Sequence, residues 1–235
     1  GRAVALVPVG STEAHGPQLP LASDVVIAVA VAQRAAALLA ARGFVTATLP
    51  AISYGVTEYA RECAGTVSVR RETVIALLTD ICESLAAQGA RGIALVNHHL
   101  EPGHFDAVHA AAAQARLRVK GCAVVVPDHR SKRWGPALGE EFCRGGSHAG
   151  QYETSLVLAA AAPLVRAERS GLASKPIDLA KAIRGGAQTF GAIPGGDRAY
   201  FGDPAKATIR EGDALLDLLA EMTAVTVVEG MGRAS

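Results

Sequence analysis

The feature that most constrains the fold is the alternation of short apolar segments with helical patterns along the chain. Residues 4–9 (VALVPV) form a continuous apolar run, and residues 24–41 follow it with alanines, valines and leucines at helical spacing. A strand that is apolar at every position is typical of a parallel sheet buried on both faces. The first forty residues therefore predict a buried strand followed by a helix that packs against it.

The same alternation continues through the rest of the chain. Further strands are expected over residues 44–49, 92–96 and 123–126, and further helices over residues 71–88, 105–118, 153–162 and 211–226. Repeated strand–helix pairs are typical of βαβ units, in which helices cover both faces of a parallel sheet. We predict an α/β fold in one domain over residues 1–235, with three layers (α/β/α) and a mostly parallel central sheet.

Composition excludes several classes of protein. The formal net charge is +1 and 19% of the residues are charged, with no long cluster of Lys and Arg, which argues against a nucleic-acid partner. No apolar stretch approaches the ~18 residues of a membrane span, and the N-terminal run is too short and lacks the flanks for a signal peptide. The four cysteines form no C-x-x-C pair. We expect reduced thiols, a cytoplasmic location and no membrane partner.

Two acid–imidazole pairs follow apolar strands. Glu13 and His15 come after residues 4–9, and His99 and Glu101 come after residues 92–96. Residues two apart in extended backbone point to the same side, and parallel strands place their ligands at their carboxyl ends. Carboxylates and neutral imidazoles suit zinc, manganese or iron. With Asp24 as a bridge, five ligands would hold two ions ~3.5–4 Å apart; alternatively, Asp24 is only a helix N-cap.

Four segments together resemble the creatininase family of metal-dependent amidohydrolases. The first is PVGSTEAHGPQLPLASD, which resembles the family pattern G-S-x-E-x-H-G-x-H-L-P-x-x-x-D. The others are NHHLE, SHAGQYETS with the apolar stretch after it, and FGDPAKATIREGDALL near the end. These segments occur in the family's order and span nearly the whole chain.

The resemblance implies a role for each polar residue of these motifs. It places Glu13, Asp24 and His99 on one metal ion, and His15, Asp24 and Glu101 on a second ion, with Asp24 bridging. It places His148 as a catalytic histidine and Glu153 as an acid near the substrate and the bridging water. Without the resemblance, His148 reads as a loop histidine bonded to backbone, and Glu153 as an acid that complements the dipole at a helix start.

The function expected from the resemblance is metal-dependent hydrolysis of the amide C–N bond of a small molecule, a cyclic amide or a formamide. The implied cofactors are two divalent ions, zinc or manganese or else iron, and the implied assembly is a homo-oligomer, often a hexamer. Other reactions in the family are C–C cleavage of a cyclic ketone and cleavage of a precursor peptide. A catalytically silent binding protein, or a serine or cysteine hydrolase without metal, are the alternatives from other classes.

The residues around these motifs leave the substrate open. Gln18 replaces a family histidine, His98 replaces a glycine and Pro102 replaces an asparagine, so creatinine itself is not assumed as the substrate. Trp134 lies in a segment that reads as a loop, and Tyr152 adjoins Glu153. Both are predicted to bind substrate, with a subunit contact as the alternative for Trp134.

Overall fold

A four-stranded parallel sheet forms the centre of the part of the chain that the structure describes. This computed structural model describes residues 2–145 and 148–234, so Ser147, which opens the third quoted motif, lies outside the described residues. The strands are β1 (Ala3–Val9), β2 (Val45–Thr48), β3 (Gly92–Asn97) and β4 (Ala123–Val125), in the order β2-β1-β3-β4. The two central strands, β1 and β3, are almost wholly buried, as their continuous apolar sequences predict.

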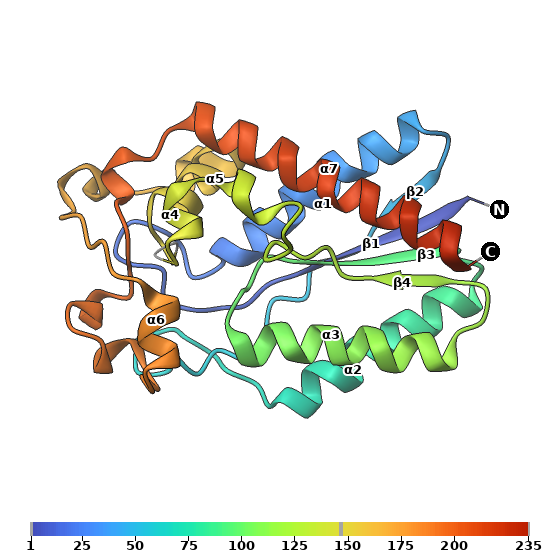
Figure 1. Cartoon of the computed structure of the whole chain (residues 1–235), viewed down its shortest axis with the longest axis horizontal. Coiled ribbons are helices and arrows are strands. Elements are labelled where there is room, and N and C mark those ends of the chain that lie inside the picture. The colour runs from blue at the N-terminus through green and yellow to red at the C-terminus, as the bar shows by residue number, and fades with distance from the viewer. Residues whose placement is uncertain (1, 146–147, 235) are drawn as a thin grey trace.

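Helices cover both faces of this sheet (Figure 1). One face carries α1 (Ser23–Ala41), α5 (Gln151–Ala161) and α7 (Ile209–Ala234), and the other carries α2 (Arg71–Ala87) and α3 (Pro102–Arg118). Side chains of β1 alternate between the two cores: Val4 and Leu6 pack toward α1 and α7, whereas Ala5 and Val7 pack toward α2 and α3. The predicted three-layer α/β/α architecture is confirmed.

By length and composition alone, α1 could cross a membrane, because its mean hydropathy reaches 1.8. In the fold, Ile27, Val31, Ala35 and Leu39 form a fully or nearly fully buried stripe at helical spacing. This stripe belongs to the core between the sheet and α7. Packing of one face therefore accounts for the apolar composition of α1.

The last helix is longer than the sequence pattern predicts, since α7 continues eight residues past position 226 to Ala234. Near its start, α7 touches the backbone of α5: a Cβ on Gly212 would lie 1.8 Å from the carbonyl oxygen of Ser155. Glycine is required at this crossing because any side chain would collide with the neighbouring backbone. The close contact ties α7 to the helix that begins beside the third motif.

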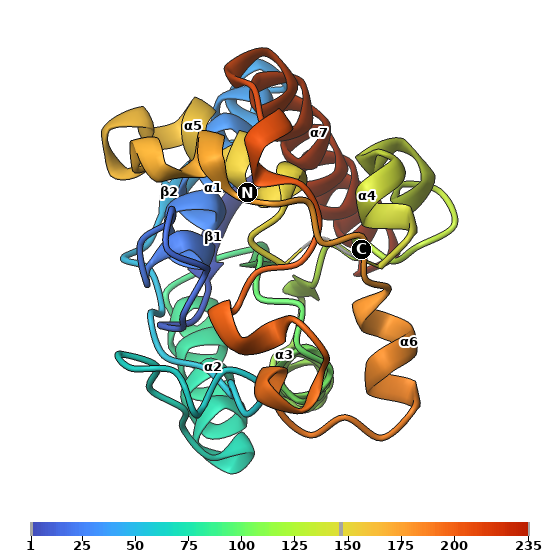
Figure 2. The same cartoon turned by 90° about the vertical axis from the view of Figure 1, so that its left-hand side faces the viewer.

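The carboxyl ends of the strands meet a group of short helices and turns, which lie at the left of Figure 1 and face the viewer in Figure 2. These include α4 (Glu140–Cys143) and α6 (Leu179–Arg184). Short 3-10 turns connect them, over Gly135–Leu138, Ala162–Leu164, Ala167–Gly171, Phe190–Ala192, Gly196–Arg198 and Pro204–Lys206. The sequence indicates only an irregular region here, and it forms the walls around the predicted metal ligands.

Candidate metal centre

The loops after β1 and β3 bring the predicted ligands together at one edge of the sheet. β1 and β3 are adjacent and parallel, so the segments that follow them leave the sheet side by side. The chain after β1 folds back closely on α1: a Cβ on Gly10 would lie 2.7 Å from the backbone nitrogen of Val25. This close approach places Asp24, in the first turn of α1, over the end of the sheet.

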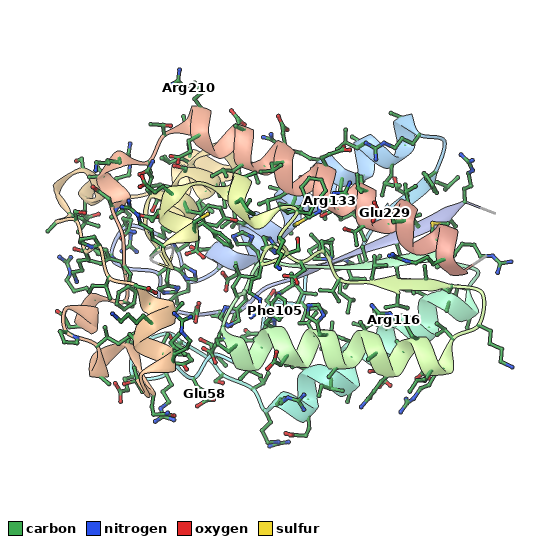
Figure 3. The ribbon with its side chains drawn as sticks, in the orientation of Figure 1. Glu58, Phe105, Arg116, Arg133, Arg210 and Glu229 are labelled. Atoms are coloured by element: carbon green, nitrogen blue, oxygen red, sulfur yellow. The ribbon has the colours of Figure 1, made fainter. Side chains whose placement is uncertain are left out.

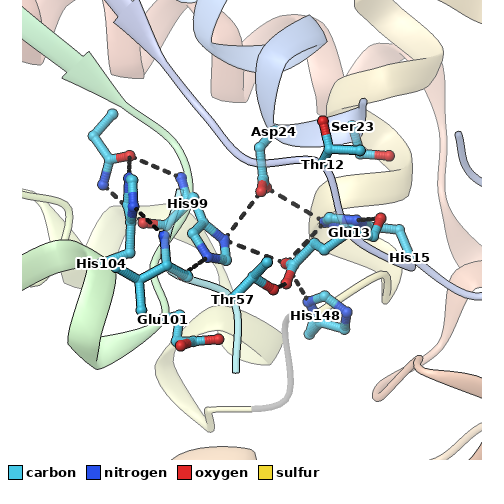
Figure 4. A network of polar contacts seen from close by, with 12 residues as sticks. Thr12, Glu13, His15, Ser23, Asp24, Thr57, His99, Glu101, His104 and His148 are labelled. Atoms are coloured by element: carbon cyan, nitrogen blue, oxygen red, sulfur yellow. Dashed lines mark hydrogen bonds and ion pairs between the residues drawn. The ribbon is translucent and has the colours of Figure 1, made fainter. Parts of the chain in front are cut away.

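Asp24 lies between two imidazoles (Figure 4). Its Oδ2 is 3.0 Å from Nδ1 of His99, and its Oδ1 is 3.3 Å from Nε2 of His15. Glu13 adds a second carboxylate, with Oε1 3.3 Å from Nδ1 of His99 and 3.8 Å from Nε2 of His15. All four residues are at most 3% exposed. Asp24 is not the N-cap of α1, which is Ala22, so that alternative is wrong.

Backbone carbonyls fix which nitrogen each imidazole turns toward the carboxylates. His15 Nδ1 lies 3.1 Å from the Glu13 carbonyl, and His99 Nε2 lies 2.8 Å from the Val56 carbonyl. A carbonyl only accepts hydrogen bonds, so each of these nitrogens donates its proton there. When the ring is neutral, as a metal ligand is, its other nitrogen therefore presents a lone pair to the carboxylates. Lone pairs and carboxylates facing each other are the arrangement that a cation completes.

The pKa values of the buried acids and imidazoles also depend on one another. Burial alone would lower the pKa of His15, but Asp24, Glu153 and Glu13 outweigh it and raise that pKa to about 10. Burial would likewise raise the pKa of Glu13, but His99 and His148 hold it at about 2. Burial would also raise the pKa of Asp24, but His15 and His99 hold it well below its usual value. These acids stay charged although buried, because the imidazoles beside them carry positive charge; a bound cation would supply that charge instead and leave the imidazoles neutral.

Two buried atoms of the cluster have no hydrogen-bond partner within the described residues: His15 Nε2 and Asp24 Oδ2. Buried polar atoms are rarely left unpartnered, and both of these point into the group of mixed nitrogen and oxygen donors. Three sets of donor atoms lie within 4.8 Å of one another: Glu13, His15 and His148; Glu13, His99 and Glu101; His15, Asp24 and Glu153. The residues therefore fit divalent zinc or manganese.

The structure groups two acids differently from the arrangement that the resemblance implies. Glu101 gathers with Glu13 and His99, not with His15. Its carboxylate accepts hydrogen bonds from the backbone amides of Glu58 and Tyr59 at 3.0 and 3.2 Å, which turns it toward that loop. Burial raises the pKa of Glu101 to about 7.

Glu153 takes the place beside His15 that the resemblance gives to Glu101. Its Oε2 lies 3.5 Å from His15 Nε2 and accepts a hydrogen bond from the Ala149 amide at 2.6 Å. Burial, reinforced by Asp24 and Glu13, raises the pKa of Glu153 to about 8. Glu153 thus lies where its carboxylate can serve as a donor to a cation.

His148 borders the cluster. Its Nε2 donates to the Ala14 carbonyl at 3.0 Å, and its Nδ1 lies 3.7 Å from Glu13 Oε1. Its ring packs against His15 and Phe190, with centroids 4.5 and 4.6 Å away. Burial and the nearby His15 lower the pKa of His148 to about 4, so the imidazole is neutral at neutral pH.

Several residues support the cluster, and of these Thr57, His104 and Asn97 were not singled out by the sequence analysis. The Thr57 hydroxyl donates to Glu13 Oε2 in a short contact, and His104 donates from Nε2 to Asn97 Oδ1 at 3.1 Å. Asn97 also accepts from the His99 amide at 3.1 Å, so it holds the backbone of a predicted ligand. Gln18 donates to the Ala149 carbonyl at 2.7 Å and supports the turn next to His148. No sequence pattern marked Thr57, because it lies in a segment without periodicity.

Trp134 and Tyr152 do not lie where the sequence analysis expected them. A cavity of about 460 Å³ opens over the cluster, and its lining includes neither residue. Trp134 packs against the hydrophobic core under α7, and Arg133 lies over its ring. Tyr152 is buried behind the cluster, stacked on His98 and next to Phe142. Phe142, Phe190 and Tyr59 supply the aromatic walls of the cavity instead.

Comparison with known proteins agrees with this fold. The family model Creatininase: Creatinine amidohydrolase matches residues 1–227. A "Mycofactocin precursor peptide peptidase" from Mycobacterium tuberculosis is 36% identical over 216 residues, covering 88% of this chain and 77% of the relative. A "Creatinine amidohydrolase" from Pseudomonas putida is 30% identical over 183 residues, covering 72% of this chain and 68% of the relative.

Solved structures show the same fold. "Creatininase Mn" superposes with a TM-score of 0.72 at 23% identity, covering 97% of this chain and 91% of the other, and another creatininase structure is of "Zn-Zn type". A metal-binding hydrolase is the class that fold and donor set define. This chain belongs to the creatininase family.

Proposed function

We propose that this protein is a metal-dependent amidohydrolase that holds two divalent cations and hydrolyses an amide C–N bond. The observation that carries the proposal is the position of Asp24 between His15 Nε2 and His99 Nδ1. One cation would be held by Glu13, Asp24 and His99 beside Glu101, and the other by His15, Asp24 and Glu153. Zinc and manganese are the proposed ions.

The chemistry depends on both the cations and the chain. Divalent cations bound at such a centre lower the pKa of water and polarise a carbonyl group. His148 supplies the proton transfer: its neutral Nδ1 faces the cluster, so it can take a proton from the attacking water. The same nitrogen can then return that proton to the leaving nitrogen as the C–N bond breaks.

The substrate class is a small molecule with a cyclic amide or formamide bond, and a short peptide is the second candidate. The peptide is kept as a candidate because this chain is 36% identical to the mycofactocin precursor peptide peptidase, against 30% to the creatinine amidohydrolase. A metal-free serine hydrolase is disfavoured, because the buried Ser11 hydroxyl has no hydrogen-bond partner, and so no base, among the described residues.

Metal depletion and reloading tests the proposal. Protein dialysed against EDTA should lose hydrolysis of every responsive compound in a panel of lactams, hydantoins, formamides and short peptides, and Mn²⁺ or Zn²⁺ should restore it. Elemental analysis of the reloaded protein should find two ions per chain. Asp80→Asn, an exposed acid on α2 outside the donor sets, serves as the control and should load and respond like the wild type. Activity that persists in EDTA would rule out the metal-dependent mechanism.

The homo-oligomer and the cytoplasmic location stay predictions. The exposed edge strand β2, where Val45 is 72% exposed, supports the proposal that another chain covers this edge. Light scattering on the purified protein would measure its mass in solution.

A further inference from the structure

The cavity over the metal centre is lined by buried or half-buried acids, which we call its floor, and by exposed arginines, which we call its walls. Acids of the cluster line its floor: Glu13, Asp24, Glu101 and Glu153. Arginines from three different segments line its walls: Arg130, Arg144 and Arg184. Figure 2 shows the end of the molecule at which these segments meet, with α3, α4 and α6 around it. A cavity with acids below and arginines above suits a substrate that carries a negative group away from the reacting bond.

Arg130 is held in place by an aromatic ring and forms only a long ion pair with an acid. Its guanidinium carbon lies 3.2 Å from the centroid of the Phe105 ring, which is itself 4% exposed and labelled on α3 in Figure 3. The nearest acid is Asp128, 4.0 Å from Arg130 Nε, and its Oδ1 also accepts the Arg130 amide at 2.8 Å. Stacking on an aromatic face orders the planar guanidinium and leaves its edge free for an oxyanion.

Arg184 ends α6, and no residue of the described chain forms a hydrogen bond or ion pair with its guanidinium. Arg144 differs, because Glu140 pairs with it one helical turn earlier. Asp178, on the same wall, accepts the Lys181 amide at 2.8 Å as the N-cap of α6. Arg184, and Arg130 with its long ion pair to Asp128, are therefore the arginines of this cavity that are most available to a ligand.

We propose that Arg130 and Arg184 form a subsite that selects substrates carrying a carboxylate away from the scissile amide. This inference rests on the proposed amidohydrolase function and deepens it by naming a property of the substrate. The planar guanidinium matches a planar carboxylate through two parallel hydrogen bonds. The acids below disfavour an unpaired anion close to them, so the arginines also orient the substrate with its neutral amide toward the floor.

Binding of matched ligands to the manganese-loaded protein tests the proposal. The probes are N-acetyl-Ala-Gly with a free carboxylate and the same dipeptide as its neutral N-methylamide, with inorganic phosphate as a third probe. Calorimetry should show the carboxylate form binding about tenfold more tightly than the amide form, the size of one good charge-assisted contact. Where a probe is hydrolysed, its kcat/KM should show the same preference.

Substitution of the arginines assigns that preference to them. Arg130→Gln and Arg184→Gln should each remove most of the preference, and Arg130→Lys should keep part of it because charge remains without the fork. Arg133→Gln is the matched control. Arg133 pairs with Glu229 of α7 at 2.7 Å, and both residues are labelled in Figure 3. Neither residue lines the cavity.

The outcomes separate this inference from the function on which it rests. A carboxylate preference that persists in both Gln variants would overturn the subsite, since the carboxylate would then bind the metal ions. Equal binding of the free acid and the amide by the wild type would also overturn it, and so would a preference for phosphate alone. An arginine-dependent preference without hydrolysis would support the subsite while counting against the amidohydrolase. Hydrolysis without any such preference would do the reverse.

Discussion

The floor of the cavity and its mouth, the part of the walls that Arg130 and Arg184 line, are built in different ways. On the floor, Glu13 and Asp24 are at most 2% exposed; Glu13 lies in the loop after β1 and Asp24 in the first turn of α1, with His15 buried beside them. At the mouth, Arg130 and Arg184 are exposed and come from a loop and a six-residue helix. The floor is fixed by sheet edges and backbone hydrogen bonds, whereas the mouth depends on one stacking contact and one short helix.

We expect the floor residues to serve the reaction and the arginines of the mouth to select the substrate. Changing a buried floor residue removes a partner from several charged groups at once, which is costly because buried charges depend on their pairs. Changing an exposed arginine removes one screened interaction. Floor substitutions should therefore abolish metal binding or turnover, whereas mouth substitutions should alter the preference among substrates.

The largest effect is expected for Asp24→Ala. It removes the carboxylate between His15 and His99, so both ions should be lost and activity should fall by at least roughly a thousandfold. Elemental analysis together with kcat/KM measures both effects. Arg184→Gln, a mouth variant, should keep its metal. If Asp24→Ala retained both ions, Asp24 would not bridge, and the floor would be less interdependent than described.

The next effect is expected for His148→Ala. His148 borders the cluster but belongs to neither of the two proposed ligand sets, so both ions should stay bound. Loss of the proton-transferring imidazole should lower kcat by about 10²–10⁴-fold. His109→Ala, half-buried on α3 and outside the cavity lining, is the control. Unchanged kcat would remove His148 from the reaction, and loss of metal would make it a ligand.

A smaller effect is expected for Thr57→Val, which keeps the shape of the side chain and removes the hydroxyl that donates to Glu13 Oε2. Loss of a bond that orients a ligand typically weakens metal binding about 10–100-fold. Competition with a chelator measures the affinity. Thr226→Val removes a hydroxyl bonded within α7 and should leave the affinity unchanged. Equal affinities for wild type and Thr57→Val would show that Glu13 needs no such support.

The parts of the molecule that sequence predicts are those set by regular periodicity. The apolar runs at β1 and β3 predict buried parallel strands, and the rule that ligands gather at their carboxyl ends predicts that Glu13, His15 and His99 meet. The structure brings these residues together with Asp24. Each step depends on spacing within a few residues, which a sequence displays directly.

The parts that sequence does not predict depend on contacts across irregular backbone. The backbone amides of Glu58 and Tyr59, far away in the sequence, donate hydrogen bonds to the Glu101 carboxylate and turn it away from His15. Glu153 therefore accompanies His15 instead. Trp134 reads as a loop residue by composition, yet its ring packs under α7. Neither contact has a periodic signal, because each depends on tertiary packing between distant segments.

A third kind of group in the molecule is a buried imidazole that does not face any acid of the cluster. His129 is 4% exposed, and its ring lies against His98 with centroids 5.3 Å apart. Burial lowers its pKa to about 4, with Asp128 opposing and Arg130 adding to the shift. On the floor the carboxylates reverse the effect of burial on His15, whereas at His129 burial prevails.

The sign of the resulting pH dependence follows from proton binding. Below the ordinary histidine pKa of about 6.5, the unfolded chain binds a proton at position 129 and the folded chain does not, so stability falls as the pH drops from about 6.5 toward 4. The slope contributed by His129 is up to about 1.4 kcal/mol per pH unit. His129→Asn should remove this contribution.

Urea denaturation of metal-free wild type and His129→Asn at pH 7 and pH 5 measures this difference. Metal is left out because acid would also release it. The diagnostic quantity is the change in unfolding free energy between the two pH values, since any packing defect from the substitution affects both. A smaller loss in the variant, by roughly 1–2 kcal/mol, is expected. Equal losses would mean that His129 is protonated in the folded protein, and that burial without a facing acid does not keep an imidazole neutral here.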